Sequence, residues 1–342
     1  MMKRRRLGRS GLMVSEIGLG TMTFGTQCGD KAEAFRIMDT ALDHGVNLLD
    51  IAEIYPVPPV KELAGITEQW VGEWLQTRSR DEVLLATKVA GPAHGWFDPP
   101  VRNGNAAIDG HQIRRAVEGS LRRLGTDYID LYQVHWPDHD MRVEDTLETL
   151  DALVREGKVR TIGCSNENAY GLMKALWVAD KYNWRRYDTI QNNYSINNRR
   201  FEDELAEICR REGVSLLPYS PLAGGVLSGK YNSTEQLPTD SRFYEYLTRG
   251  GARQRAMATR FVNEKSLALT AKVVALAEEL GTHPVTLATA WSMHHDFVAS
   301  SLIGVSSFAQ LAPILAATEL EITADISAKI DTYHQEHLYP MG

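Results

Sequence analysis

The feature that most constrains the fold is a repeated unit: an apolar run, a loop, an amphipathic stretch and a glycine. The runs are VSEIGLG (14–20), VNLLDI (46–51), EVLLATK (82–88), YIDLYQVH (128–135), VRTIGCS (159–165), YDTIQNN (187–193), VSLLPYS (214–220) and FVASSLIGV (297–305). Most are continuously apolar, which is typical of parallel strands covered on both faces. Eight strands interleaved with helices predict an α/β fold, a closed (β/α)8 TIM barrel. We expect residues 1–342 to form this one domain, although the length also allows two.

Helix boundaries are marked between the runs. Asp30 and Glu33 form a capping-box pattern before an amphipathic stretch, and Gly45 stands where a helix would end. Similar signals bound the stretches at 109–125, 143–157 and 199–213. Each closing glycine lies just ahead of the next apolar run, as the repeated unit requires.

Three segments fall outside the repeat. Residues 5–18, RRLGRSGLMVSEIG, predict a short N-terminal hairpin ahead of the barrel. The stretches 90–110 and 231–264 are longer than simple connections, so we expect them to be long loops that shape a pocket at the C-terminal face. No G-x-G-x-x-G follows any run, which disfavours a Rossmann domain.

Charge and cysteine content narrow the class of protein. A net charge of −7 and a single basic run, Lys3 to Arg6, disfavour a nucleic-acid partner, because phosphate binding needs clustered cations. The residues after this run include Arg9, Ser10 and Glu16, so they form no signal-peptide core. No window is apolar enough to span a membrane. Three widely spaced cysteines suggest neither disulfides nor zinc, and we expect a reducing cytoplasmic location.

Four chemically active side chains fall at the ends of successive runs. Asp50 ends the second run and Tyr55 follows five residues later; Lys88 ends the third and His135 the fourth. In a (β/α)8 barrel these positions meet at the C-terminal mouth, where catalytic groups are found. One lysine there would more often be solvated, but the four together indicate a site.

The set has a coherent chemistry. A phenol has a pKa of about 10, and a lysine cation beside it favours the phenolate and lowers that pKa. Asp50 would keep Lys88 charged and in place, while His135 could orient a carbonyl oxygen or help to relay the proton. The arrangement suits protonation of an oxygen while a hydride reaches the attached carbon.

These residues lie in motifs that closely resemble those of the aldo-keto reductases. The motifs are GLGTMTFG (18–25), LLDIAEIY (48–55), LLATK (84–88), LYQVHWP (131–137), GCSN (163–166) and YSPLAGGVLSGKY (219–231). They occur in the family's order from about residue 5 to the C-terminus, and IYPVPP (54–59) is nearest in wording to the bacterial Tas-like branch. The resemblance implies a (β/α)8 barrel that reduces aldehydes or ketones to alcohols with NADPH. It also implies a catalytic tetrad of Asp50, Tyr55, Lys88 and His135, with Tyr55 as general acid.

The resemblance further implies where the cofactor binds. The nicotinamide carboxamide would be held by Ser165, Asn166 and Gln191. The ring would stack on Tyr219, over a floor made by Gly20, Thr21 and Met22, and Asp50 would also contact the cofactor. The pyrophosphate would lie against Ser220, Pro221, Leu222 and Gly224. These pairings are physically sensible, because amide side chains hydrogen-bond the carboxamide, an aromatic ring stacks on the nicotinamide ring, and backbone N–H groups bind phosphate.

The adenosine end fits the family less well. Ser306, Ser307 and Gln310 resemble its adenosine and ribose-phosphate contacts. The stretch has no Arg or Lys for a 2′-phosphate, and Ile314 stands where many relatives have Asn. NADP(H) is therefore expected from the resemblance, with NAD(H) left open, and Arg242 could supply a charge or be a solvated loop residue.

Other residues allow more than one interpretation. Trp136 is expected to line the substrate pocket with Tyr55 and His135, whereas Trp96 and Phe97 could close over substrate or anchor their loop. The sequence indicates no metal site. It leaves the natural substrate and the oligomeric state open.

Two alternative functions remain at this point. One is a cofactor-binding regulatory subunit resembling the potassium-channel β subunits, which can retain the tetrad. The other is a lyase or aldolase with Lys88 as a Schiff base, which is weaker because that chemistry needs a neutral, unpaired lysine.

Overall fold

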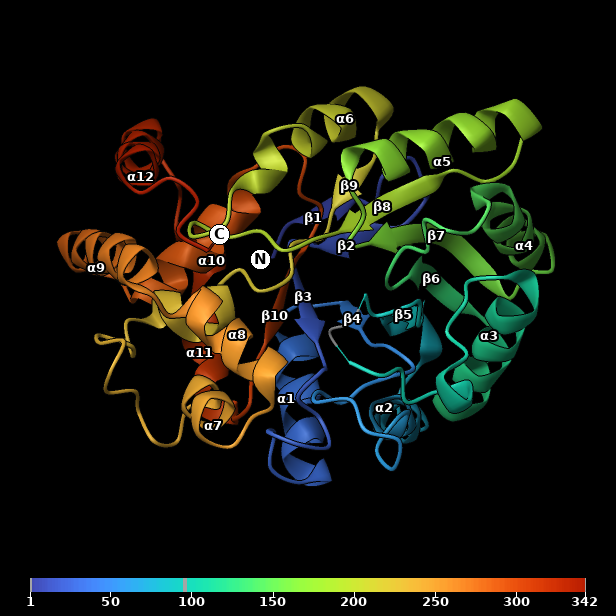
Figure 1. The fold of residues 1–342 in the computed structure, drawn as a ribbon, viewed down its shortest axis with the longest axis horizontal. Coiled ribbons are helices and arrows are strands. Elements are labelled where there is room, and N and C mark those ends of the chain that lie inside the picture. Colours follow the sequence, from blue (N-terminus) through green and yellow to red (C-terminus); the bar gives the residue numbers. More distant parts are fainter. Residues whose placement is uncertain (1, 95–96, 342) are drawn as a thin grey trace.

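The computed structural model describes residues 2–94 and 97–341, and its centre is a ring of eight parallel strands (Figure 1). The strands are β3 (Ile17–Gly20), β4 (Leu48–Asp50), β5 (Leu84–Val89), β6 (Ile129–Val134), β7 (Val159–Ser165), β8 (Tyr187–Gln191), β9 (Ser215–Leu216) and β10 (Ser301–Gly304). They pair in the order β10-β3-β4-β5-β6-β7-β8-β9. Parallel bridges from Leu216 to Val298 and from Tyr219 to Leu302 join the two ends of the sheet. The predicted (β/α)8 barrel is confirmed.

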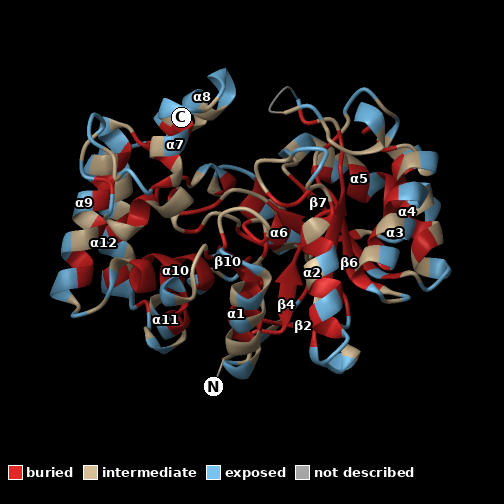
Figure 2. Ribbon diagram, turned by 90° about the horizontal axis from the view of Figure 1, so that it is seen from below, coloured by how far each residue is buried: buried red, intermediate tan, exposed pale blue. Residues whose placement is uncertain are grey.

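Helices surround the ring. Those that follow the strands are α1 (Lys31–Asp43), α2 (Ile66–Leu75), α3 (Gly110–Leu124), α4 (Val143–Arg155), α5 (Ala169–Tyr182), α6 (Leu205–Glu212), α9 (Glu264–Glu279) and α10 (Pro284–His294). The short helix α11 (Leu311–Leu315) and the longer helix α12 (Ala324–Glu336) follow β10. Buried residues lie along the strands and the inner helix faces, as the red ribbon of Figure 2 shows. None of the described helices is both long and apolar enough to cross a lipid bilayer.

The helix-boundary predictions are largely confirmed. The side chain of Asp30 accepts a hydrogen bond from Glu33 N at the start of α1, and Gly45 follows its end with φ +92°. In a full capping box the Glu33 carboxylate would accept from Asp30 N. Here it accepts a hydrogen bond from Phe308 N instead, in the segment after β10. The stretch 199–213 is helical only from Leu205, after a 3-10 turn at 200–202.

The predicted N-terminal hairpin is present and closes the bottom of the barrel. Strands β1 (Arg4–Arg6) and β2 (Met13–Ser15) pair antiparallel, so the apolar run at 14–20 is divided at Glu16 between β2 and β3. Leu7, Leu12 and Val14 of the hairpin join the inward-facing side chains of the strands in one apolar cluster. This cluster fills the barrel interior, which leaves the opposite end as the open mouth.

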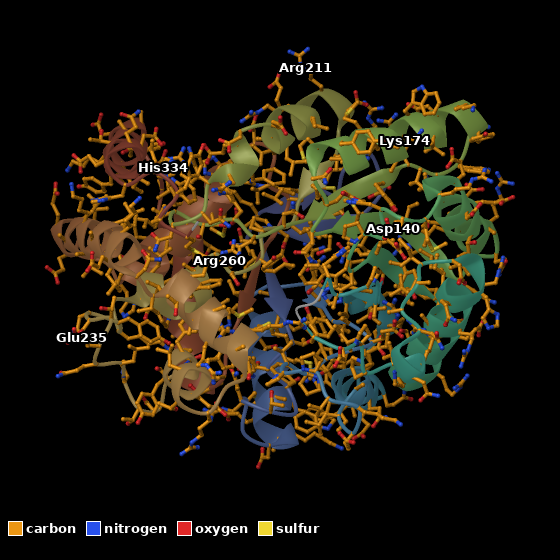
Figure 3. All side chains as sticks on the ribbon, viewed as in Figure 1. Asp140, Lys174, Arg211, Glu235, Arg260 and His334 are labelled. Atoms are coloured by element: carbon orange, nitrogen blue, oxygen red, sulfur yellow. The ribbon has the colours of Figure 1, made fainter. Side chains whose placement is uncertain are left out.

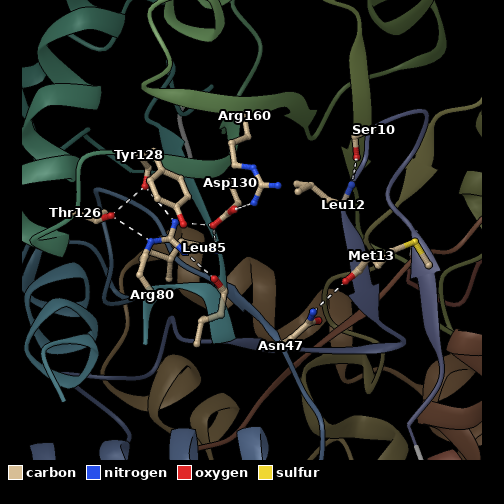
Figure 4. Close-up of polar contacts among 11 residues, drawn as sticks. Ser10, Leu12, Met13, Asn47, Arg80, Leu85, Thr126, Tyr128, Asp130 and Arg160 are labelled. Carbon is tan, nitrogen blue, oxygen red and sulfur yellow. Dashed lines mark hydrogen bonds and ion pairs between the residues drawn. The ribbon is translucent and has the colours of Figure 1, made fainter. Parts of the chain in front are cut away.

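Polar contacts brace the N-terminal ends of the strands (Figure 4). Asn47 Nδ2 donates to Met13 O at 2.9 Å and thereby ties the hairpin to the barrel. The buried carboxylate of Asp130 accepts from Arg80 Nη2 and from Arg160 Nη1, each at 2.6 Å. These contacts lie at the stabilising end of the barrel, away from the mouth.

Long segments rise above the C-terminal ends of the strands (Figure 2). The 90–110 segment contains a 3-10 turn at Arg102–Gly104. The prediction of a long loop at 231–264 is wrong in part, because that segment folds into α7 (Arg242–Thr248) and α8 (Ala252–Phe261). Ser241 caps α7 by accepting a hydrogen bond from Tyr244 N.

Candidate active site

Strand register brings the four predicted residues together at the mouth. Asp50 lies beside Ala86 of β5, two residues before Lys88, and His135 directly follows β6. Tyr55 reaches the same place through the loop after β4. All four are buried, with Tyr55 8% and His135 7% exposed, so the tetrad stands at the floor of the mouth.

Lys88 is the centre of this cluster. Its Nζ donates to Asp50 Oδ2 and to Ile51 O, each at 2.7 Å, and to Tyr55 Oη at 3.4 Å. The side chain of Lys88 has no exposed surface and that of Asp50 is 5% exposed. The three contacts use all three ammonium protons and fix the ammonium group beside the phenol.

The pKa of Tyr55 differs from the prediction. Burial raises the pKa of Tyr55 well above its ordinary value, and the Asp50 carboxylate raises it further. The net direction is therefore opposite to the lowering expected from Lys88. Burial also lowers the pKa of Lys88, while the Asp50 charge acts in the opposite direction. The phenol consequently keeps its proton at neutral pH.

His135 completes the cluster as a neutral imidazole. Its ring stands nearly perpendicular to that of Tyr55, with centroids 5.7 Å apart. Burial lowers the pKa of His135 well below its ordinary value, and the positive charge of Lys88 adds to the effect. The half-buried indole of Trp136 stacks next to the imidazole, with centroids 6.2 Å apart.

Amide and hydroxyl groups form a second layer across the mouth. Gln191 Nε2 donates to Asp50 Oδ1 at 2.8 Å, and Ser165 Oγ donates to Gln191 O at 2.7 Å. Asn166 Nδ2 donates to His135 O at 2.9 Å, while Asn166 Oδ1 accepts from Tyr219 Oη at 2.8 Å. The structure thus connects the predicted carboxamide contacts to the tetrad itself.

The first strand supplies the floor beside Asp50. Gly20 lies next to Asp50 in register, and Thr21 donates to Asp50 O through both its N and its Oγ1. A Cβ on Gly20 would come within 3.1 Å of Ile303 O, so only a small residue fits there. Met22 O accepts from Val57 N at 2.9 Å and links this floor to the Tyr55 loop.

The segment after β9 is a tight turn that ends in a pair of glycines. The predicted contacts Ser220, Pro221 and Leu222 lead into Gly224 and Gly225, whose φ angles are +66° and +93°. This left-handed backbone favours glycine and turns N–H groups toward one side.

Two cations converge on this turn. A Cβ on Gly224 would lie 2.7 Å from Arg242 Nη2, and one on Gly225 would lie 3.4 Å from Lys230 Nζ. Arg242 Nε is buried without a hydrogen-bond partner among the described residues. The sequence reasoning missed Lys230, although it closes the quoted motif at GKY. Glycines and two cations are the features expected of a phosphate-binding turn.

The predicted adenosine contacts form a separate group after β10. Ser306 N donates to Gln310 Oε1 at 2.9 Å, and Ser307 lies between them beside Phe308. The Arg36 guanidinium of α1 lies over the Phe308 ring, 3.6 Å from its centroid. The sequence reasoning missed Arg36, because nothing in the local sequence links positions so far apart.

Two walls flank the mouth. Phe97 and Val101 of the 90–110 segment pack against a buried cluster that includes Tyr55 and Ala90, whereas Trp96 lies outside the described residues. On the other side, Arg260 of α8 donates from Nε to Met341 O at 2.8 Å, which ties α8 to the C-terminus. Figure 3 labels Arg260 on α8 and Asp140 in the loop after β6.

The residues at the mouth can therefore hold a nucleotide and present a phenol to a reacting oxygen. The described residues contain no group of three or more His, Cys, Asp or Glu side chains placed to hold a metal ion. The three cysteines, Cys28, Cys164 and Cys209, are free and buried.

Comparisons with known proteins agree with this geometry. The model of the Aldo/keto reductase family matches residues 16–334. The protein Tas of Escherichia coli is 41% identical over 99% of both chains. A putative aryl-alcohol dehydrogenase of Schizosaccharomyces pombe is 30% identical over 93% of this chain and 92% of its own. Norsolorinic acid reductase A of Aspergillus parasiticus is 30% identical over 94% of this chain and 78% of its own. The chain belongs to the aldo/keto reductase family and is an oxidoreductase of the nicotinamide-dependent kind.

Proposed function

We propose that the protein reduces aldehydes or ketones to alcohols with NADPH, with Tyr55 as the general acid. The observation that carries the proposal is the position of the Tyr55 hydroxyl, 3.4 Å from an ammonium group that Asp50 and Ile51 O hold in place. A fixed phenol beside a fixed cation is suited to giving up a proton only when charge develops on a nearby oxygen.

The residues at the mouth fit a nicotinamide dinucleotide. The carboxamide would be held by Ser165, Asn166 and Gln191. The Tyr219 ring would support the nicotinamide, and the hydrogen bond from Tyr219 Oη to Asn166 orients that ring. Lys230 and Arg242 would pair the pyrophosphate at the glycine turn, where Arg242 Nε is buried and unpartnered within the described residues. The nearby cations explain why a phosphate would be stabilised there.

NADPH is proposed over NADH because of Arg36. Its guanidinium covers Phe308, between the predicted contacts Ser307 and Gln310, and so supplies the charge that the local sequence lacks. A 2′-phosphate would pair with this group, whereas a free 2′-hydroxyl would gain little from it.

The tetrad has distinct tasks in the proposed reaction. A nicotinamide held by Ser165, Asn166 and Gln191 would supply the hydride that the carbonyl carbon receives. Tyr55 transfers its proton to the carbonyl oxygen, so that the product is a neutral alcohol. Lys88 stabilises the phenolate that remains, and Asp50 holds Lys88. His135, neutral because burial lowers its pKa, donates a hydrogen bond that positions the oxygen.

The proposed substrates are bulky, apolar carbonyl compounds such as aryl aldehydes. The apolar residues Met22, Val57, Phe97 and Val101 pack against the buried cluster that contains Tyr55, and Trp136 lies beside His135. One relative carries the name of an aryl-alcohol dehydrogenase. Apolar walls of this kind favour aromatic rings over charged sugars or keto acids.

The test compares wild type with Tyr55→Phe. NADPH and NADH binding are measured by fluorescence titration, and turnover is measured with aryl aldehydes. We expect Tyr55→Phe to lower kcat by about 100-fold or more while the Kd for NADPH changes less than about threefold. Tyr170→Phe, at a tyrosine that is 76% exposed, is the matched control.

Three outcomes contradict parts of the proposal. Near-normal turnover by Tyr55→Phe excludes this residue as the acid. NADH binding as tight as NADPH binding excludes a 2′-phosphate contact at Arg36. Tight NADPH binding without turnover of any carbonyl by wild type indicates a regulatory subunit.

A further inference from the structure

A buried ion pair beside the tetrad has no part in the proposed chemistry. Glu53 lies in the loop between Asp50 and Tyr55. Its Oε2 accepts from Arg102 Nη1 at 2.6 Å, and its Oε1 accepts from Ala90 N at 2.6 Å. The two charged side chains are 3% and 7% exposed. The pair joins two segments that lie 49 residues apart in sequence.

Because the pair is buried, its net contribution to the stability of the fold is expected to be small. Both charges lose water, and a buried ion pair often stabilises a protein no more than apolar residues of the same size would. Burial raises the pKa of Glu53, while Arg102 opposes the shift, which agrees with a large desolvation cost. The best-attested benefit of such pairs is that they specify one arrangement of the chain.

Arg102 fixes the segment in which it lies. It adopts a left-handed backbone with φ +50° and is followed by two further residues of positive φ, Asn103 and Gly104. Its Nε donates to Asn105 O at 3.2 Å and its Nη2 to Ala90 O at 3.4 Å. One guanidinium therefore contacts the beginning and the later part of the 90–110 segment.

The segment reaches the other side of the mouth as well. His94 Nε2 lies 2.7 Å from Pro137 O, in the loop that carries His135 and Trp136. A Cβ on Gly91 would lie 2.0 Å from Trp136 O, so the two loops pack backbone to backbone. The segment thus spans the tetrad from the Tyr55 loop to the Trp136 loop.

We propose that Glu53 and Arg102 are positioning residues that hold the 90–110 segment over the tetrad, where Phe97 and Val101 form the wall that orients the carbonyl substrate. This inference rests on the proposed reductase function for its kinetic part. Its structural part, that the pair holds the segment in place, is independent of that function.

The sequence provides a built-in reporter. Arg102 is the single Lys or Arg between Val89 and Ile113, so trypsin can cut this stretch only after Arg102. In wild type the guanidinium is buried against Glu53, and cleavage there requires local opening. Glu53→Gln keeps the shape and an acceptor for Ala90 N but leaves the Arg102 charge buried without its partner.

We expect Glu53→Gln to speed tryptic cleavage after Arg102 by about tenfold or more. We also expect it to raise KM for an aryl aldehyde by about tenfold, with kcat and the Kd for NADPH nearly unchanged. Arg102→Lys keeps the charge and the tryptic site but not the planar fork of hydrogen-bond donors. Its cleavage rate and its KM should lie between those of Glu53→Gln and wild type. Glu62→Gln, at an exposed glutamate of the same loop, is the matched control.

Two outcomes overturn the inference, and a third bears on the proposed function alone. Cleavage at the wild-type rate together with a wild-type KM shows that the pair does not hold the segment. Cleavage throughout the chain or loss of NADPH binding by Glu53→Gln shows a general structural role. Absence of turnover by wild type contradicts the proposed function alone, because the cleavage rates still report on the pair.

Discussion

Removal of Lys88 should cost more stability than its size suggests. Lys88→Met keeps most of the side-chain volume but removes the ammonium that lies 2.7 Å from Asp50 Oδ2. The Asp50 carboxylate, 5% exposed, would then remain charged with Gln191 Nε2 as its remaining side-chain donor. Breaking a buried pair by removing one partner costs about 3–5 kcal/mol, a large part of the roughly 5–15 kcal/mol that holds a typical domain folded.

A second variant separates charge from packing. Asp50→Asn combined with Lys88→Met removes both charges, and the Asn oxygen can still accept from Gln191 Nε2 at the 2.8 Å position. The double variant should recover most of the loss, so it should be about 2–3 kcal/mol more stable than Lys88→Met. Neither variant should retain reductase activity, because both lack the cation beside Tyr55.

The assay is urea unfolding at pH 7 without cofactor, followed by circular dichroism and by tryptophan fluorescence. Coincident transitions are needed before free energies are extracted by linear extrapolation. Lys61→Met, at an exposed lysine, is the control and should change stability by less than about 0.5 kcal/mol. The reasoning is refuted if Lys88→Met loses less than about 1 kcal/mol, or if the double variant is no more stable than the single one.

Two further predictions concern pH and packing. Burial lowers the pKa of His295 from 6.5 to about 4, so the unfolded chain takes up a proton there first. Stability present above pH 6.5 is lost as the pH falls toward 4, by up to about 1.4 kcal/mol per unit. His295→Phe should flatten this part of the stability profile relative to wild type and to His111→Gln at an exposed site; parallel profiles would contradict it. Gly91→Ala should lower kcat/KM by about tenfold or more, because its Cβ meets Trp136 O at 2.0 Å, whereas Gly11→Ala has free space; equal activities would contradict this.

Much of the fold was predictable because the barrel repeats one local signal. Each of the eight apolar runs contains one of the eight parallel strands, and the N-cap at Asp30 and the hairpin follow from local chemistry. Strand ends at one mouth also made the cluster of Asp50, Tyr55, Lys88 and His135 predictable. Strand periodicity and capping are short-range properties, so one sequence is enough to detect them.

What the sequence did not reveal depends on distant parts of the chain. Helices α7 and α8 are short, and Gly250 and Gly251 between them hide a helical period in the 231–264 segment. Arg36 meets Phe308 only after the first and last strands pair. The pKa of Tyr55 is raised, whereas the sequence predicted that Lys88 would lower it. Burial is the largest cause of the shift, and a sequence does not report burial.

The hydrogen bond from Gln191 to Asp50 links positions 141 residues apart, across the barrel from β8 to β4. During synthesis the chain emerges from its N-terminus, so the first half can place Asp50, Tyr55, Lys88 and His135 on neighbouring strands before β8 exists. The Asp50 carboxylate has all its hydrogen bonds only after β8, the sixth strand of the ring, has joined the sheet. Formation of the site is therefore a late event in folding, and regained turnover after denaturation would time the closure of the ring rather than the collapse of its first strands.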